Sequence, residues 1–429
     1  MRIGYYVHHH GRGHATRAGV IGAQLARRGH AVTYLGSGVL PAGDRVVLAS
    51  DADDADEPFV DPDAGGRLHW APLGGGYAER SAQIAAWVTQ ARPDVVVVDV
   101  SVEVTALVRL LGVPVVVVGQ PGRRDDDPHA LAFGLAAAVL APWSDGLDVA
   151  PHLERLGEKV VRVGGVSRFA GSRPGLNSVG DGSACPVPSD SGSASPGPSW
   201  GDSPSLGTHG DAAKMAGGAA AGGPVKASPN AASRGVADSS RPLGVLLVGG
   251  EGWDDAGLPD AVVRAVPEVA WHAPDAENPV ETLLAEADVV VTHAGQNALA
   301  DVAAFGVPAV VVPQERPFDE QADMARALEA AGIAHGLALG ASAGDVAAAV
   351  REMLAGDDER STGRAWARWR VDGAAERAAD VIEGAARGDV VERGADEAGC
   401  AARGVVDDGV DGPAATGGEA PALGDGEAQ

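Results

Sequence analysis

The sequence is poor in several features that would assign it to a familiar class. Two cysteines in 429 residues, Cys185 and Cys400, are too few and too far apart for a disulfide framework or a cysteine zinc site. No run of about 18 apolar residues is present, so no membrane-spanning helix is expected. The N-terminus lacks the apolar segment of a signal peptide, so we expect a cytoplasmic protein.

Basic residues are scarce as well, with 33 Lys and Arg against 59 Asp and Glu and a net charge of -26. Such a chain lacks the basic surface that nucleic acids require, so no nucleic-acid partner is expected. The charge is uneven: acids and bases number 19 and 16 in residues 1–170, five and five in 171–241, 25 and 9 in 242–385, and 10 and 3 in 386–429. An anionic ligand in the second half must therefore be held by local donors.

Aromatic residues make up only 4% of the chain, whereas glycine occupies 61 positions. Residues 171–241 are mostly Gly, Ser, Ala and Pro with a single aromatic, Trp200, which predicts a disordered linker. The tail at 386–429 has no aromatics and many Gly, Asp and Glu residues, which predicts disorder there too. Because the chain is also too long for one core, we expect two folded domains, residues 1–170 and 242–385.

Both folded segments alternate short Val-rich runs with Ala-rich helical stretches. Strands are expected at 2–7, 31–35, 95–99, 113–118, 160–163, 244–248, 289–292 and 309–312. Helices are expected at 15–28, 296–305, 319–331 and 343–355. Continuous apolar strands between helices predict an α/β fold of two Rossmann-like domains with parallel sheets. Ligands would bind in the cleft between them, beyond the carboxyl ends of the strands.

The turn after the first strand is the first candidate site. Gly13 and His14 lie between a strand and a helix, where the backbone can approach a ligand and expose helix N-terminal amides. His14 at this cleft either takes part in chemistry or packs and caps the helix. Arg12 and Arg17 either meet a phosphate or are simply solvated. The turn lacks the third glycine and the acid of the dinucleotide-binding fingerprint, so neither NAD nor any other cofactor is predicted.

A second candidate is Asp99, the last residue of a Val-rich strand. A carboxylate at the carboxyl end of a buried parallel strand lies where ligands bind. Asp99 could orient His14 and stabilise its imidazolium, as carboxylates do in other histidine-based sites. The alternative is that Asp99 caps the helix that follows.

The third candidate lies in the second half, where a Val-rich strand is followed by His293, Gly295, Gln296 and Asn297. A glycine turn that leads into a helix start points amides, together with the side chains of His293 and Asn297, at an anion such as a diphosphate. Asp301 lies further along the same helix, in reach of a ribose hydroxyl pair.

Two further elements flank this helix start. Glu320 and Gln321 form a carboxylate–amide pair that can accept from and donate to sugar hydroxyls, or can instead stabilise and cap a helix start. Upstream, Gly249 and Gly250 follow a strand in a Gly-rich loop that could approach a phosphate, although a plain turn explains them equally well.

No metal site is predicted. No Asp-x-Asp signature lies near the candidate ligand-binding segments at 249–250, 293–301 and 320–321. The acids at 51–56 and 125–127 are interpreted as loop acids. His8, His9 and His10 alternate sides of an extended chain, which disfavours a metal cluster.

The second half resembles the nucleotide-sugar-binding half of GT-B glycosyltransferases. The resemblance rests on His293, Gly295, Asn297, Asp301, Glu320 and Gln321. The stretch is similar to the UDP-glycosyltransferases of small molecules and to glycosyltransferase family 28, which includes the lipid-intermediate N-acetylglucosaminyltransferase of peptidoglycan synthesis. This resemblance implies that His293, Asn297 and nearby amides hold the diphosphate. It also implies that Asp301 holds the ribose and that Glu320 and Gln321 hold the donor sugar. Asp301 replaces the commoner Glu and reaches one methylene less far.

The first half resembles the opening of the same superfamily, whose catalytic His falls on His14 and whose partner Asp falls on Asp99. The resemblance implies transfer of a hexose or N-acetylhexosamine from a nucleotide diphosphate sugar, such as a UDP-sugar, to a hydroxyl acceptor. The transfer would be inverting and independent of metal. Arg12, Gly13 and Arg17 are then candidates for acceptor binding.

Other functions remain open at this point. The turn at 11–17 also resembles hydrolases that release a sugar from its nucleotide, and a nucleotide-sugar binding protein without turnover would need the same donor site. A lipid-linked acceptor, with peripheral association at the inner face of the membrane, is one option because Arg12, Arg17, Arg27 and Arg28 gather near the first turn. Scattered surface arginines are the plainer interpretation. The acceptor and the oligomeric state are not predicted.

Overall fold

The structure is a computed structural model that describes residues 1–9, 12–51, 60–73, 76–171, 241–249 and 252–389. The predicted linker and tail lie outside the described residues, apart from Gly171, Arg241 and residues 386–389. Gly250, a predicted donor-binding residue, also lies outside them. None of the helices in the described part of the chain combines the length and apolar character needed to cross a bilayer.

The N-terminal domain is built on a seven-stranded parallel sheet with the order β3-β2-β1-β4-β5-β6-β7. Its strands are β1 (Arg2–Val7), β2 (Ala31–Gly36), β3 (Asp44–Val47), β4 (Val95–Asp99), β5 (Val115–Val118), β6 (Ala138–Ala141) and β7 (Val160–Arg162). All five residues of β4 are buried, which explains the unbroken apolar run of its first four residues. Val7 pairs with Asp99 in register, so the loops after β1 and β4 leave the sheet side by side. The sequence does not predict β3 or β6, because β3 is largely exposed and β6 is rich in alanine.

Helices connect these strands and cover the sheet. They are α1 (Gly13–Arg27), α2 (Gly76–Ala91), α3 (Val102–Leu110), α4 (Asp127–Leu135) and the 3-10 segment η1 (Pro151–Lys159). Ser101 caps α3 and Asp126 caps α4, each through a side-chain oxygen that accepts a backbone N–H. In contrast, no side chain among the described residues caps α1, so its first amides are left for another acceptor.

The C-terminal domain has a five-stranded parallel sheet with the order β12-β11-β10-β8-β9. Its strands are β8 (Leu243–Leu247), β9 (Ala270–His272), β10 (Val289–Thr292), β11 (Ala309–Val311) and β12 (His335–Gly336). Its helices are α5 (Leu258–Ala265), α6 (Val280–Glu286), α7 (Gln296–Phe305), α8 (Glu320–Ala330) and α9 (Ala343–Ala355), with 3-10 segments η2 (Pro317–Asp319) and η3 (Arg364–Trp369). The predicted two-domain α/β architecture is confirmed, and β10, α7 and α9 have the predicted bounds.

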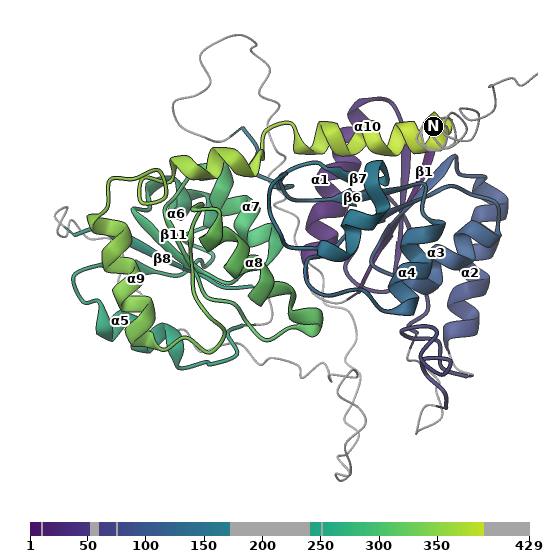
Figure 1. Ribbon diagram of the computed structural model, residues 1–429. Coiled ribbons are helices and arrows are strands. Elements are labelled where there is room, and N and C mark those ends of the chain that lie inside the picture. Colours follow the sequence, from purple (N-terminus) through teal and green to yellow (C-terminus); the bar gives the residue numbers. More distant parts are fainter. Residues whose placement is uncertain (10–11, 52–59, 74–75, 172–240, 250–251, 390–429) are drawn as a thin grey trace, which may run out of the picture.

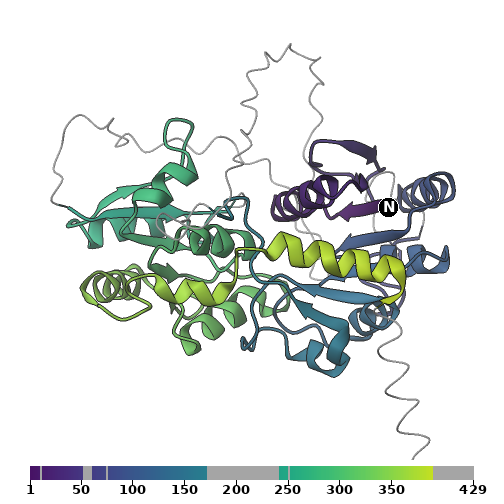
Figure 2. The ribbon, with the colours of Figure 1, turned by 90° about the horizontal axis from the view of Figure 1, so that it is seen from above.

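The last helix, α10 (Ala374–Arg387), leaves the C-terminal domain and packs on the N-terminal one (Figure 1, Figure 2). Its apolar face joins the core formed by α1, β4 and β6. Arg28, just after α1, donates to Asp380 and Glu383 of α10 at 2.6 and 3.1 Å. Residues 242–385, predicted as one domain, are therefore not one spatial unit, because hydrophobic periodicity predicts a helix but not the sheet on which it packs.

Candidate active site

His14, Arg17 and Asp99 form a cluster where the loops after β1 and β4 meet. His14 Nδ1 lies 2.9 Å from Asp99 Oδ1, and Arg17 donates from Nε to Oδ2 at 3.0 Å and from Nη2 to Oδ1 at 2.6 Å. Asp99 is fully buried and Arg17 is 3% exposed, whereas His14 keeps 19% exposure. Burial alone would raise the pKa of Asp99, but the charges of Arg17 and His14 and their hydrogen bonds hold it well below its usual range. Asp99 is therefore ionised at neutral pH.

This carboxylate sets the tautomer of His14. An ionised carboxylate can only accept, and it lies closer to Nδ1 (2.9 Å) than the Arg17 Nη2 donor does (3.3 Å), so we assign the proton of the neutral ring to Nδ1 and the lone pair to Nε2. Val100 follows with a φ of 62°, a left-handed conformation that is unfavourable for a β-branched residue and turns the chain sharply beside the cluster. A histidine held in this tautomer can accept a proton from a bound hydroxyl, which is the role predicted for His14.

Arg12, Gly13 and Arg17, the candidates for acceptor binding, lie in different surroundings. Arg17 is buried, and its Nη1 donates to Gln296 Oε1 of α7 at 2.8 Å, so all three guanidinium nitrogens are engaged. The Gly13 carbonyl accepts from Asn297 Nδ2 at 2.6 Å. Arg12 is the one of the three whose side chain is exposed.

The N-terminus of α7 faces the His14 cluster across the domain interface. Gln296 and Asn297, predicted to bind the donor, both reach the N-terminal domain through the hydrogen bonds just described. Gln296 Nε2 is buried and has no hydrogen-bond partner among the described residues. A buried donor without a partner marks a position that a ligand oxygen could occupy.

His293 is oriented by its own turn. Its Nδ1 accepts from the Gly295 N–H at 3.0 Å, so the proton of the neutral ring is on Nε2. Burial, followed by the charge of Arg316, lowers the pKa of His293 to about 4, so the ring is neutral at pH 7. A Cβ on Gly249 would lie only 2.9 Å from Nε2. The N–H donor of His293 and the bare backbone of Gly249 therefore face the same space.

The predicted sugar-binding pair is held by protein contacts. Glu320 accepts from Arg124 Nη2 of the N-terminal domain at 2.9 Å. Gln321 is buried, and its Oε1 accepts from the backbone N–H groups of Ala294 and Gln314 at 3.2 and 3.0 Å. The Gln321 carbonyl thus braces the segments that follow β10 and β11.

Asp301, the predicted ribose ligand, is 6% exposed and faces the segment that leaves the N-terminal domain. It accepts from Ser167 Oγ at 2.7 Å and lies 3.3 Å from Arg168 Nε. Burial raises the pKa of Asp301, while Ser167 and Arg168 oppose this shift. Binding a ribose through Asp301 would require exchange of one of these contacts for a hydroxyl.

The turn before α8 is strained and touches the N-terminal domain. Phe318 and Asp319 have φ values of 63° and 57°, a left-handed conformation that is uncommon outside glycine. Gly122, with a φ of 89°, approaches so closely that an added Cβ would lie 2.1 Å from the Phe318 carbonyl oxygen. The guanidinium of Arg124 lies over the Phe318 ring at 4.7 Å. This turn is therefore a main point of contact between the domains.

A cavity of about 110 Å³ lies in the N-terminal domain beside the His14 cluster. Its wall includes His8, whose ring centroid lies 5.5 Å from that of His14, and it extends to His69 and His129. His69, His129 and Arg124 are not among the site residues predicted from the sequence. Residues 119–129 follow β5 at the same sheet edge as Asp99, and this position could have marked them as site residues. The charged run at 125–127 was instead interpreted as loop acids.

Part of the chain matches a known family model, and its fold resembles several solved structures. Residues 275–378 match the glycosyltransferase family 28 C-terminal domain. No curated protein sequence matches the chain. Among solved structures, the chain resembles a glycosyltransferase of kitacinnamycin, which is 18% identical with 90% of this chain and 98% of that chain covered and a TM-score of 0.54.

Two further solved structures have the same architecture. MurG of Acinetobacter baumannii is 14% identical, with 89% of this chain and 99% of that chain covered and a TM-score of 0.53. The calicheamicin glycosyltransferase CalG4 is 16% identical, with coverage of 90% and 98% and a TM-score of 0.52. At these identities the structural likeness establishes the fold, and the family match is confined to residues 275–378. The chain thus has the GT-B fold, and its residues 275–378 match the glycosyltransferase family 28 C-terminal domain.

Proposed function

We propose that the protein transfers a hexose or N-acetylhexosamine from a nucleotide diphosphate sugar, a UDP-sugar in the first instance, to a hydroxyl acceptor with inversion at the anomeric carbon. The observation that carries this proposal is the position of His14 opposite the start of α7. Two hydrogen bonds link the two sides, from Arg17 to Gln296 and from Asn297 to the Gly13 carbonyl. A diphosphate at the start of α7 would therefore hold its sugar close to the proposed base.

The chemical step is a single displacement. The acceptor oxygen bonds to the anomeric carbon while the bond from that carbon to the diphosphate oxygen breaks with its electron pair. His14 Nε2 takes the proton that the acceptor hydroxyl loses, and Asp99 stabilises the resulting imidazolium. Both oxygens of Asp99 are occupied by Arg17 and His14, so this carboxylate is not placed to attack the sugar. Direct displacement by the acceptor oxygen then inverts the configuration at the anomeric carbon.

The departing diphosphate is stabilised by neutral donors. The amides at the start of α7, the Nε2–H of His293 and the backbone of Gly249 offer hydrogen bonds without a formal charge. These donors would compensate for the acidic surroundings of the second domain, which the sequence composition predicts to disfavour anions. Glu320 and Gln321 would bind the sugar and Asp301 the ribose, each after exchange of a protein contact.

Donor identity is tested by a thermal-shift screen of nucleotide sugars, since a ligand that binds the folded state raises its melting temperature. A UDP-sugar should give the largest shift, and it should bind with equal affinity with and without Mg²⁺. His293→Ala should lose this shift. Preference for another nucleotide, or donor binding that requires Mg²⁺, would contradict this part of the proposal.

Transfer is separated from hydrolysis by measuring UDP release with the donor alone and with added acceptors. Release that rises only with an acceptor supports transfer, and NMR of the product reports the anomeric configuration. Rapid release with water alone would instead support a nucleotide-sugar hydrolase. A protein that binds a UDP-sugar but releases no UDP under either condition would be a sensor, and the proposed reaction would be wrong.

A lipid-linked acceptor is part of the proposal that can be tested directly. The predicted arginine cluster is smaller than expected, because Arg17 is buried and Arg28 is paired with Asp380 and Glu383 of α10. Arg12 remains exposed beside His14. Co-sedimentation with anionic vesicles at low salt should detect membrane association, and Arg12→Ala should weaken it. Absence of binding would remove the peripheral membrane location from the proposal.

A further inference from the structure

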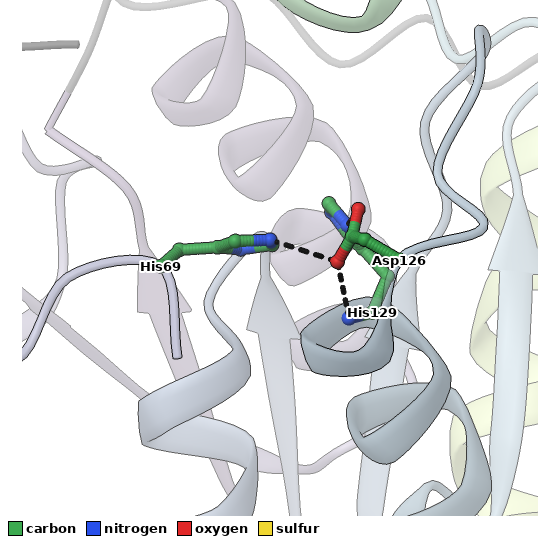
Figure 3. Close-up of side chains that lie close together, drawn as sticks. All are labelled: His69, Asp126 and His129. Carbon is green, nitrogen blue, oxygen red and sulfur yellow. Dashed lines mark hydrogen bonds and ion pairs between the residues drawn. The ribbon is translucent and has the colours of Figure 1, made fainter. Parts of the chain in front are cut away.

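A second cluster brings two imidazoles and a carboxylate together. His69 Nε2 lies 3.1 Å from Asp126 Oδ1, and His129 Nδ1 lies 2.7 Å from Asp126 Oδ2 (Figure 3). One donor atom from each residue can be chosen so that all three lie within 4.8 Å of one another. Zinc bonds of about 2.0–2.1 Å at tetrahedral angles place ligand atoms about 3.3 Å apart, so small shifts would bring these donors around one ion.

Two structural elements position the cluster, the start of α4 and the loop that carries His69. Asp126 caps α4, where Oδ1 accepts the His129 backbone N–H at 3.0 Å. The backbone N–H of His69 donates to Glu103 Oε1 at 2.7 Å, and Glu103 lies in the first turn of α3. The three side chains are therefore held in place before any ion binds, as a ligand set requires.

The plain structural alternative is that Asp126 is only a helix cap. A cap needs one oxygen and one backbone N–H. Here the second carboxylate oxygen faces a ring nitrogen of His129, and the first also faces His69, which comes from a separate loop. Arg124 lies nearby and would repel a cation, but its charge is paired with Glu320.

We propose that His69, Asp126 and His129 bind a zinc-class divalent cation, with a remaining coordination position open toward the cavity. His69 and His129 line that cavity together with His8, which lies beside His14. The cation would therefore coordinate an oxygen or nitrogen of the molecule bound in the cavity. The site is built from α4 and the His69 loop rather than from α7, so it is compatible with a diphosphate that departs without a metal.

The first test measures zinc content by mass spectrometry after incubation with ZnCl₂ and dialysis. The full-length protein should retain one zinc per chain, and His69→Ala and Asp126→Asn should retain none. Asn is itself a good helix cap, so Asp126→Asn keeps α4 intact and remains informative if His69→Ala fails to fold. The matched control is His9→Ala, which removes another histidine near an acid, 4.0 Å from Asp51, and should keep the zinc.

Wild-type protein without bound zinc, or an Asp126→Asn variant that retains it, would overturn the proposal. Loss of zinc in His9→Ala alone would assign the metal to the N-terminal histidines and overturn it as well. The open position is tested with cobalt-loaded protein, whose visible absorption should change when azide enters the coordination shell; an unchanged spectrum would rule the open position out. Neither assay uses a sugar donor, so the result is independent of the proposed transfer reaction.

Discussion

Arg17 and Asp99 form a buried ion pair in which one guanidinium donates to both carboxylate oxygens, at 3.0 and 2.6 Å. The same guanidinium donates to Gln296 across the domain interface at 2.8 Å. A single side chain thus connects the carboxylate that orients His14 with the helix that faces the donor. A change in the arrangement of the domains would reach the proposed base through this contact.

Arg17→Gln should destabilise the protein by about 3–5 kcal/mol, because it leaves the Asp99 carboxylate buried without its main partner. Gln296→Ala is the matched control, since it removes the interdomain hydrogen bond but keeps the ion pair, and should lower the stability by only about 1 kcal/mol. Urea unfolding measures both. Equal losses in the two variants would show that the buried pair is not the more important contact.

His14→Ala should lower kcat for transfer by about 100- to 10,000-fold, the usual contribution of a positioned general base. Its affinity for UDP should stay close to that of the wild type, because His14 does not hold the diphosphate in our proposal. His30→Ala is the control, since His30 lies in the same domain but pairs with Glu383 of α10. Kinetics and calorimetry report the two quantities, and a His14→Ala variant with normal kcat would exclude His14 as the base.

Gly249→Ala should weaken UDP-sugar binding by about tenfold or more, because the new methyl group would lie 2.9 Å from His293 Nε2 and occupy the proposed diphosphate space. Gly344→Ala in α9 is the control, since its nearest neighbour would be Ser342 Oγ at 3.5 Å. Calorimetric titration measures both affinities. Unchanged binding by Gly249→Ala would place the diphosphate elsewhere.

Gly122→Ala should separate the domains. Its φ of 89° is unfavourable for alanine, and the added Cβ would lie 2.1 Å from the Phe318 carbonyl oxygen of the other domain. Gly112→Ala carries the same kind of backbone strain, with a φ of 80°, but its Cβ would meet no atom within 4 Å. Small-angle X-ray scattering should therefore show a larger radius of gyration for Gly122→Ala alone. The same radius in both variants would mean that this contact does not hold the domains together.

Stability should fall as the pH is lowered from about 6.5 to about 4. Burial, followed by the charges of Arg124 and Arg155, lowers the pKa of His152 to about 4. Between these two pH values His152 binds a proton in the unfolded chain but not in the folded chain. This difference lowers the free energy of unfolding by up to about 3 kcal/mol. His152→Phe, which can still stack on Phe133, should reduce the pH dependence of the melting temperature, and His293, whose pKa is also lowered to about 4, should account for part of the slope that remains. A slope in this variant identical to that of the wild type would contradict this assignment.

The local elements could be predicted from the sequence where hydrophobic pattern and turn residues agree. The strand β10, the turn at Gly295 and the helix α7 follow one another with clear boundaries, so these elements have the bounds that the sequence predicted. The pairing of His14 with Asp99 followed from topology, because loops after neighbouring parallel strands share one sheet edge.

Contacts between distant segments could not be predicted in the same way. Arg17 was expected to face an external ligand, but its partners lie 82 and 279 positions away, and no local pattern specifies them. The zinc-class site was missed for a similar reason, since His69 lies 57 positions before Asp126. The spacing of Asp126 and His129 alone indicates an ordinary helix cap.

The return of α10 to the N-terminal domain has a consequence for biosynthesis. In chain order the whole C-terminal sheet comes between the N-terminal sheet and the helix that covers part of it. The C-terminal domain is therefore an insertion within the N-terminal one. On the ribosome, the apolar surface around Ile21 and Leu140 stays uncovered until residue 387 has emerged, so the first domain to be synthesised is the last to be completed.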